Sequence, residues 1–197
     1  MTTKELIYKN AVQLFEKEGF QNIGMRELAK SVGIKASSIY NHYKSKDEIL
    51  FDILNTLINK MKEEIYPLFK ERYANSKEFL INTSLKTNNF FENPEIITLT
   101  KIIIPEQFNN SKLKESLLLE FIIKPRGAYT YYFKSLINKG LMIKTDPNLA
   151  AKIYHSFFVY HFYEMNLSNN NELYFTTHKD LFINHIKLFI DYFKIKG

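Results

Sequence analysis

Hydrophobic residues recur every three or four positions along most of this chain, a spacing typical of α-helices that bury one face. The pattern begins after Thr2 and Glu5, whose spacing is that of a capping box, and the first helix is expected to end at Gly19. Further helices are expected between Gly24 and Gly33, at about 35–43, 45–67, 77–91, 95–108, 112–138 with a kink at Pro125, 146–167 and 173–196. No useful run alternates in the manner of a β-strand. The sequence therefore predicts an all-α fold of about nine helices.

The helix beginning at Ser45 suggests how the chain is divided. Its apolar face is too long for a domain of about fifty residues to bury alone. We therefore expect it to link an N-terminal three-helix domain, residues 1–47, to a larger helical domain, residues 48–197.

Residues 25–43 have the pattern of a helix-turn-helix, in which two short helices meet at a tight turn. Gly33 can supply the left-handed conformation of that turn. Ile34, Ile39 and Tyr43 are expected to pack inward. The opposite side of the second helix is polar, and its hydroxyl, amide and imidazole groups suit contacts with phosphates or bases. Those residues are Lys35, Ala36, Ser37, Ser38, Tyr40, Asn41 and His42.

Two further cations are placed where DNA contacts are plausible on chemical grounds. Lys46 lies in the first turn of a helix, where its charge opposes the helix dipole unless it shares a phosphate with the helix N-terminus. Arg26, at the start of the preceding helix pair, can reach a phosphate or a guanine. Taken alone, a lysine of this kind is usually a solvated charge, His42 a surface histidine and Tyr43 a core aromatic, whereas Tyr40 is a core aromatic about as often as not.

Composition limits the class of protein more than it identifies a partner. The net charge is +6, but residues 1–60 hold nine Lys or Arg against seven Asp or Glu, so the excess is not concentrated there. The chain has no Cys, which excludes disulfides and thiolate metal sites. No apolar run is long enough for a signal segment or a membrane span, so a cytoplasmic protein is expected. We find no catalytic set, no cofactor motif and no convincing metal site, since the histidine pairs lack further ligands.

The N-terminal motifs closely resemble those of the tetracycline-repressor (TetR) family, without a gap from about Lys4 to Leu54. The matching segments are Gly19-Phe20, Met25-Arg26-Glu27-Leu28-Ala29, Val32-Gly33-Ile34, Ser38-Ile39-Tyr40-Asn41-His42-Tyr43 and Ser45-Lys46-Asp47-Glu48-Ile49-Leu50. Position by position, the resemblance implies base contacts from Arg26, Ala36, Ser37 and Tyr40, and phosphate contacts from Ser38, Asn41, His42 and Lys46.

Three positions depart from the family pattern. Gly24 stands where Thr or Ser usually caps the second helix, so that phosphate contact is expected to be lost. Lys35 replaces a Ser, and Ser37 replaces a common Gly. These changes bear on which operator sequence is read.

The resemblance also implies roles for the rest of the chain. It implies a cavity for a small apolar ligand among the middle helices, for which the candidates are Phe90, Phe91, Phe108, Tyr129, Tyr132, Phe133, His155 and Phe158. A packed aromatic core is the alternative for each of them. The last two helices should form a four-helix bundle with a second copy, and they carry more apolar residues than one thin domain can hide. The expected interface residues are Phe157, Tyr160, Phe182, Ile186, Phe189 and Phe193.

The function expected from the sequence is sequence-specific binding of double-stranded operator DNA by a homodimer. We expect a repressor that a small apolar ligand releases from a near-palindromic operator. One alternative is a DNA-binding regulator with no small ligand, controlled by a protein partner or by its own level. Another, from a different class, is a helical enzyme or lipid carrier that retains a vestigial N-terminal module.

Overall fold

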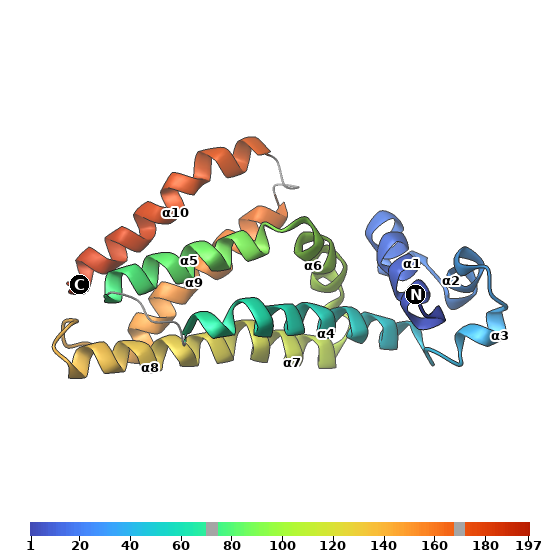
Figure 1. Ribbon diagram of the computed structural model, residues 1–197, viewed down its shortest axis with the longest axis horizontal. Coiled ribbons are helices and arrows are strands. Elements are labelled where there is room, and N and C mark those ends of the chain that lie inside the picture. The colour runs from blue at the N-terminus through green and yellow to red at the C-terminus, as the bar shows by residue number, and fades with distance from the viewer. Residues whose placement is uncertain (70–74, 168–171) are drawn as a thin grey trace. The chain divides into compact units, whose positions relative to one another are not determined.

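The computed structural model describes residues 1–69, 75–167 and 172–197, and for 172–179 only the helical backbone. All regular elements in these ranges are helices, which confirms the all-α prediction (Figure 1). None of the helices in the described part of the chain combines the length and apolarity that a membrane span requires. The chain divides into two compact units, each built from two separate segments.

Unit 1 comprises Met1–Met61 and Asn93–Ser116. Its helices are α1 (Thr3–Glu18), α2 (Met25–Val32), α3 (Ala36–Ile39), the greater part of α4 (Lys46–Glu64), α6 (Pro94–Glu106) and most of α7 (Ser111–Leu117), with a short 3-10 helix at Phe20–Asn22. Its core contains fully buried side chains from α1, α2 and α4, such as Ile7, Leu28 and Ile53, which come from the apolar stripes of these helices.

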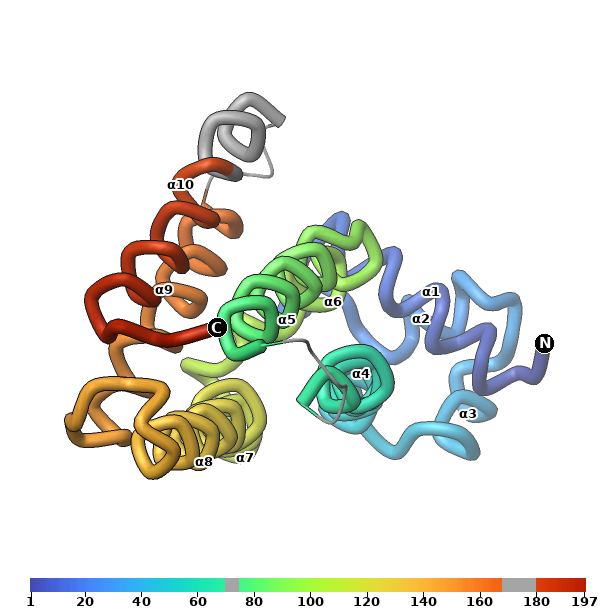
Figure 2. Tube along the Cα trace, turned by 60° about the vertical axis from the view of Figure 1, so that its left-hand side comes forward, coloured from blue at the N-terminus to red at the C-terminus, as the bar shows by residue number. Residues whose placement is uncertain are grey.

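Unit 2 comprises Lys62–Glu92 and Leu117–Gly197. It contains a 3-10 helix (Tyr66–Phe69), α5 (Ser76–Phe91), a π-helix (Leu118–Ile123), α8 (Lys124–Asn138), α9 (Pro147–Leu167) and α10 (Glu172–Tyr192). Helix α8 packs against α9, and α10 packs against both α5 and α9 (Figure 2). Aromatic side chains from α5, α8, α9 and α10 form one buried core.

Several helix ends follow the local signals in the sequence. The Thr2–Glu5 capping box is present in both directions, with N–H···O distances of 2.7 and 3.2 Å. At the start of α4, Ser45 Oγ accepts the Glu48 N–H, and the Glu48 carboxylate accepts the N–H of Lys44. The helix expected over 112–138 is not a single α-helix. A π-helix precedes Pro125, which has no N–H to donate and whose ring crowds the preceding turn.

Units 1 and 2 divide the chain differently from the two domains expected from the sequence. Helix α6 and most of α7 belong with the N-terminal helices, although they lie far from them in the sequence. The boundary expected after residue 47 concerns functional domains, and it stays a prediction.

Candidate nucleic-acid interface

The turn between α2 and α3 has the geometry expected from Gly33. This residue has φ 75° and ψ 27°, in the left-handed region. The N–H of Gly33 donates to the carbonyl of Lys30, and the N–H of Ile34 donates to the carbonyl of Ala29. These two hydrogen bonds form a Schellman motif, which satisfies two carbonyls at the end of α2. The turn therefore fixes the direction in which the chain enters α3.

We expect Gly33→Ala to destabilise unit 1 by about 1–2 kcal/mol, the cost of placing a Cβ in the left-handed region. No heavy atom lies within 4 Å of the position that a Cβ would occupy, so the effect should be purely conformational. Urea denaturation measures it. Gly24→Ala is the matched control, because Gly24 also has open space around it but an extended backbone (φ −100°). An unchanged midpoint for Gly33→Ala would contradict the argument.

The second helix of the motif exposes its polar side, as the sequence predicted. Ile39 and Tyr43 are fully buried and Ile34 is half-buried. Tyr40 is 50% exposed, although it is a large aromatic residue next to a buried isoleucine. The candidate contact residues are exposed or half-buried at the surface: Arg26, Lys35, Ala36, Ser37, Ser38, Tyr40, Asn41 and His42. These side chains of α2, α3 and the turn after α3 are therefore accessible to a partner.

Helix α3 is shorter than the expected 35–43. Its α-helical part is only Ala36–Ile39, and the chain then tightens into turns. The N–H groups of Asn41 and His42 donate to the carbonyls three residues earlier. These i→i+3 bonds have the 3-10 pattern, which is common at helix ends. Asn41 and His42 consequently leave the helix on a tighter path than an extended α-helix would give them.

Lys46 has a structural partner that sequence reasoning missed. Its Nζ donates to the carbonyl of Phe20 at 2.6 Å and lies 4.3 Å from the centre of the Phe20 ring. The lysine thus ties the first turn of α4 to the 3-10 helix that follows α1, and the cation–π contact adds to this tie. A cation can occupy the start of α4 because backbone carbonyls 25 and 26 residues away stabilise it. The phosphate contact expected for Lys46 stays a prediction.

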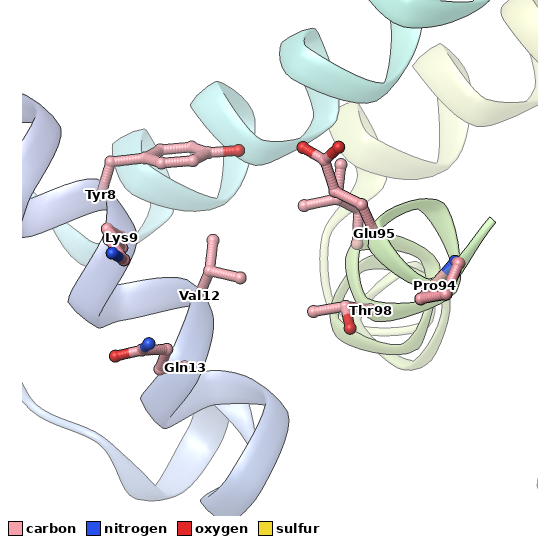
Figure 3. A pocket seen from close by; sticks show the side chains of 8 residues that line it. Tyr8, Lys9, Val12, Gln13, Pro94, Glu95 and Thr98 are labelled. Atoms are coloured by element: carbon pink, nitrogen blue, oxygen red, sulfur yellow. The ribbon is translucent and has the colours of Figure 1, made fainter.

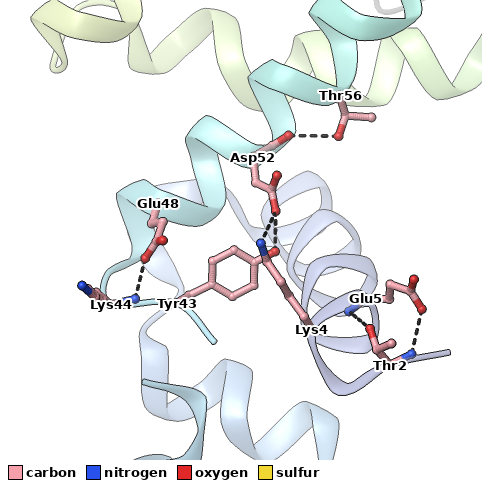
Figure 4. A network of polar contacts seen from close by, with 8 residues as sticks. All are labelled: Thr2, Lys4, Glu5, Tyr43, Lys44, Glu48, Asp52 and Thr56. Carbon is pink, nitrogen blue, oxygen red and sulfur yellow. Dashed lines mark hydrogen bonds and ion pairs between the residues drawn. The ribbon is translucent and has the colours of Figure 1, made fainter. Parts of the chain in front are cut away.

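A polar network holds the end of the motif against α1 and α4 (Figure 4). The hydroxyl of Tyr43 donates to a carboxylate oxygen of Asp52 at 2.6 Å. Lys4 Nζ lies 3.6 Å from the same oxygen and 5.0 Å from the Tyr43 ring centre. Burial, and then the Asp52 carboxylate, raise the pKa of Tyr43, so its hydroxyl remains a donor. The sequence signal for Asp52 was a carboxylate interrupting the apolar run of α4.

A groove of about 410 Å³ lies between α1 and α6 within unit 1 (Figure 3). The side chains of Tyr8 and Val12 on α1 face those of Glu95 and Thr98 on α6 across it. Glu95 forms an ion pair with Lys60 of α4, with an N···O distance of 2.9 Å. No residue lining this groove was a candidate from the sequence.

In unit 2, most of the expected ligand-binding residues form part of one aromatic core. The ring of Tyr129 lies 6.2 Å from those of Phe133 and His155. Phe158 reaches the same core through Tyr154, with ring centres 5.1 Å apart. Phe90, Tyr129, Phe133 and His155 are buried, whereas Phe91, Tyr132 and Phe158 are half-buried. Their grouping agrees with a ligand site and also with the alternative of a packed core.

Phe90 and Phe91 are not among the residues of this core, Phe108 lies apart from it, and one neighbour of the core was overlooked. Phe108 is 83% exposed and belongs to unit 1, because it follows the end of α6 at Gln107. Arg126 was not singled out, yet it precedes Tyr129 by three residues on α8. A cation on the inward-facing stripe that Tyr129 and Phe133 define was a usable signal.

His155 is expected to make the stability of the protein depend on pH. Burial, and secondly the Arg126 cation, lower the pKa of His155 from 6.5 to about 4. Between these values the unfolded chain binds the proton and the folded chain does not. The free energy of unfolding should therefore fall by about 3 kcal/mol as the pH falls from 7 to 4, a loss absent above pH 6.5.

Urea denaturation across this pH range, with the His155→Gln variant beside the unaltered protein, measures this contribution. Other groups titrate in both proteins, so the difference between the two curves isolates His155. The pKa of His185 is also lowered by burial, which makes His185→Gln a second comparison. Parallel curves for the unaltered protein and His155→Gln would rule out the assigned role.

The expected dimer residues are mostly buried within the chain's own core. Phe182, Ile186, Phe189 and Phe193 are 0–4% exposed and pack on α5, α8 and α9. Phe157 is half-buried and stacks on His185, with ring centres 3.7 Å apart. Of the six, Tyr160 alone is exposed, at 60%. Helix α10 therefore uses this apolar face inside the subunit, and the dimer interface itself stays a prediction.

A different apolar face of α9 and α10 is exposed. On α9, Leu149, Ile153, Tyr160, Tyr163 and Leu167 recur every three to seven residues and are 43–80% exposed. On α10, Leu181, Leu188 and Tyr192 do the same at 57–71%. Such spacing places each set on one side of its helix.

The chain is similar to known proteins both in sequence and in fold. Residues 7–53 match the family model described as bacterial regulatory proteins, tetR family. The IcaR protein of Staphylococcus aureus strain Newman, named as a negative transcriptional regulator of the biofilm operon icaADBC, is 36% identical over 78 residues. That match covers 34% of this chain and 42% of IcaR. The chain thus spans less than half the length of the curated relatives it matches, 35% for another staphylococcal regulator.

Solved structures extend the likeness of fold to nearly the whole chain. SmeT, solved in complex with triclosan, has a TM-score of 0.73 at 15% identity, covering 100% of this chain and 93% of SmeT. A regulator from Mesorhizobium loti MAFF303099, described as TetR-family, has a TM-score of 0.71 at 17% identity, covering 96% and 95%. The motif around Gly33 thus lies in a segment, residues 7–53, that is similar to bacterial regulatory proteins of the tetR family, and nearly the whole chain shares the fold of these solved structures.

Proposed function

We propose that this protein is a transcriptional repressor that binds a near-palindromic operator as a homodimer and leaves it when a small apolar ligand binds. The observation that carries the proposal is the exposed polar face of α2 and α3, which the buried Ile39 and Tyr43 hold in place. A helix with this exposure, supported by a second helix across a Gly turn, has the form that enters a major groove. The regulator role named for IcaR supports the same direction of control.

The exposed stripes of α9 and α10 supply the second element of the proposal. Several large apolar side chains on two adjacent helices are unusual on the surface of a monomer. Two such surfaces related by a two-fold axis would form a four-helix bundle and cover each other. We therefore move the proposed interface to Ile153, Tyr160, Leu188 and Tyr192 and their neighbours on these stripes.

Selection of random 30-base-pair duplexes by the purified full chain tests the function. We expect enrichment of a sequence with two inverted half-sites, because a two-fold dimer presents the same reading surface twice. A selected pool without inverted symmetry would contradict the proposal that the protein is a repressor of a near-palindromic operator.

The affinity for the selected duplex should depend strongly on salt. If the dimer neutralises about eight phosphates, the slope of log K against log [salt] should be near −7. Fluorescence anisotropy over a range of NaCl concentrations measures this slope. A slope near zero would mean that the candidate face does not neutralise phosphates.

A second candidate keeps DNA binding but has no small ligand. The observation in its favour is that Phe133 and Tyr154 are completely buried in a continuous aromatic core. The SmeT–triclosan complex favours the ligand-responsive reading for a protein of the same fold. Fluorescence anisotropy shows whether a small molecule releases the selected duplex from the protein. Release supports the ligand-responsive repressor, and its absence supports the regulator without a small ligand.

A further inference from the structure

Three buried nitrogen atoms of unit 2 have no hydrogen-bond partner among the residues that the structure describes. They are Nε of Arg126, in the first turn of α8, Nδ1 of His155, on α9, and Nε2 of His185, on α10. The ring of His185 stacks on Phe157. His155 is only 7% exposed. Buried polar groups in native proteins nearly always have a partner, so each exception requires an explanation. Arg126 and His155 lie on helices that pack against each other, so their two unpartnered atoms point to one common cause.

The position of Arg126 on α8 places it on the inward face of the helix. Tyr129 and Phe133 follow it by three and seven residues, which is the spacing of one helix face, and both are buried. Arg126 itself is half-buried. It lies three residues after the end of the π-helix Leu118–Ile123, a rare conformation that occurs frequently at functional sites.

The charge of Arg126 is not neutralised within the described part of the chain. No Asp or Glu there forms an ion pair with it. Glu120, the nearest acidic residue along the sequence, is engaged by Lys124 at 2.5 Å and by the Tyr66 hydroxyl at 3.2 Å. The pKa of about 4 leaves His155 neutral at pH 7. The two side chains together therefore carry one positive charge without a counter-charge among the residues that are described.

The surroundings of these two side chains are aromatic. The ring of Tyr129 lies 6.2 Å from that of His155. Phe158 and Phe162 follow His155 by three and seven residues, which places them on the same side of α9. The Phe162 ring in turn lies 5.2 Å from that of Phe91 on α5. An apolar surface thus adjoins the unpaired cation.

We propose that Arg126 and His155 bind the carboxylate of a hydrophobic organic acid, and that this acid is the effector of the repressor. The second part rests on the proposed function, whereas binding of the acid does not. A guanidinium matches a carboxylate in shape and can donate two parallel hydrogen bonds to it. His155, with its proton on Nδ1, donates a third, and the apolar part of the acid lies along Phe158 and Phe162.

Isothermal titration calorimetry of the full chain at pH 7 tests the proposal with two matched pairs of probes. These are octanoate against octanamide and phenylacetate against phenylacetamide, which differ in charge but hardly in shape. We expect at least one acid to bind about tenfold or more tightly than its amide. Arg126→Met should abolish that preference and leave the amide unchanged. Lys124→Met is the matched control, since it removes a cation two residues away that is already paired, and it should keep the preference.

Two results would overturn the proposal: neither acid binds more tightly than its amide, or Arg126→Met binds the acid as tightly as the unaltered protein. The comparison of acid with amide needs no variant, so it holds even if Arg126→Met folds poorly. A purely structural Arg126 predicts a lower melting temperature for Arg126→Met. An unpaired cation predicts an equal or higher one, because its burial is unfavourable. Operator selection is measured separately, so a protein that selects no palindrome but prefers the acid refutes only the repressor function.

Discussion

Leu188→Glu should convert the dimer into a monomer and weaken operator binding by about 100-fold or more. Leu188 is 70% exposed in the middle of the apolar stripe of α10, where it contributes little to the core of its own subunit. A carboxylate there would be buried without a partner in the proposed four-helix bundle. Loss of the second reading surface removes the gain that comes from binding two half-sites at once.

Light scattering and anisotropy measure the two effects together. The unaltered protein should have twice the chain mass of 23.4 kDa, and Leu188→Glu should have the chain mass itself. Lys187→Glu is the control, because it places the same carboxylate on the neighbouring exposed position outside the stripe. A Leu188→Glu variant that keeps twice the chain mass would show that the exposed stripe is not the interface.

Arg26→Ala should lower operator affinity and broaden the sequence preference. Arg26 is exposed in the first turn of α2 and has the position to which the family resemblance assigns a base contact. Loss of such a contact is expected to cost about 1–3 kcal/mol for each copy of the reading surface. Base discrimination should fall at one symmetric pair of operator positions and stay unchanged elsewhere.

The control for Arg26 is Lys30→Ala, one turn further along α2. Lys30 is also exposed but has no assigned contact with DNA. Anisotropy on a panel of single-base operator variants compares the two. Equal losses for both variants on every duplex would mean that Arg26 acts only through its charge, and its assignment to a base would then be wrong.

Features encoded by neighbouring residues could be predicted from the sequence. The Thr2–Glu5 capping box and the left-handed turn at Gly33 each depend on a few adjacent side chains and on backbone preferences. Ile39 and Tyr43 were expected inside because they lie one turn apart on a helix whose other side is polar. The candidate DNA-binding face could be predicted for the same reason.

Features that depend on contacts between residues far apart in the sequence could not be predicted. Lys46 bonds to a carbonyl 26 residues away, which no local pattern indicates. Helix α10 carries apolar residues on two faces, and periodicity alone does not say which face meets its own subunit. The face with Phe182 and Ile186 is inside, and the face with Leu188 is exposed. The choice of the face with Phe182 and Ile186 for the expected interface follows from that ambiguity.

The central claim is that residues 35–43 form the surface that touches DNA. Amide hydrogen exchange of the full chain, with and without the selected duplex, tests this most directly. The account predicts that bound duplex slows the exchange in peptides covering 25–46. It predicts no change of the exchange rate in peptides of α5. Unchanged exchange over residues 35–43, with protection confined to another region, would contradict it.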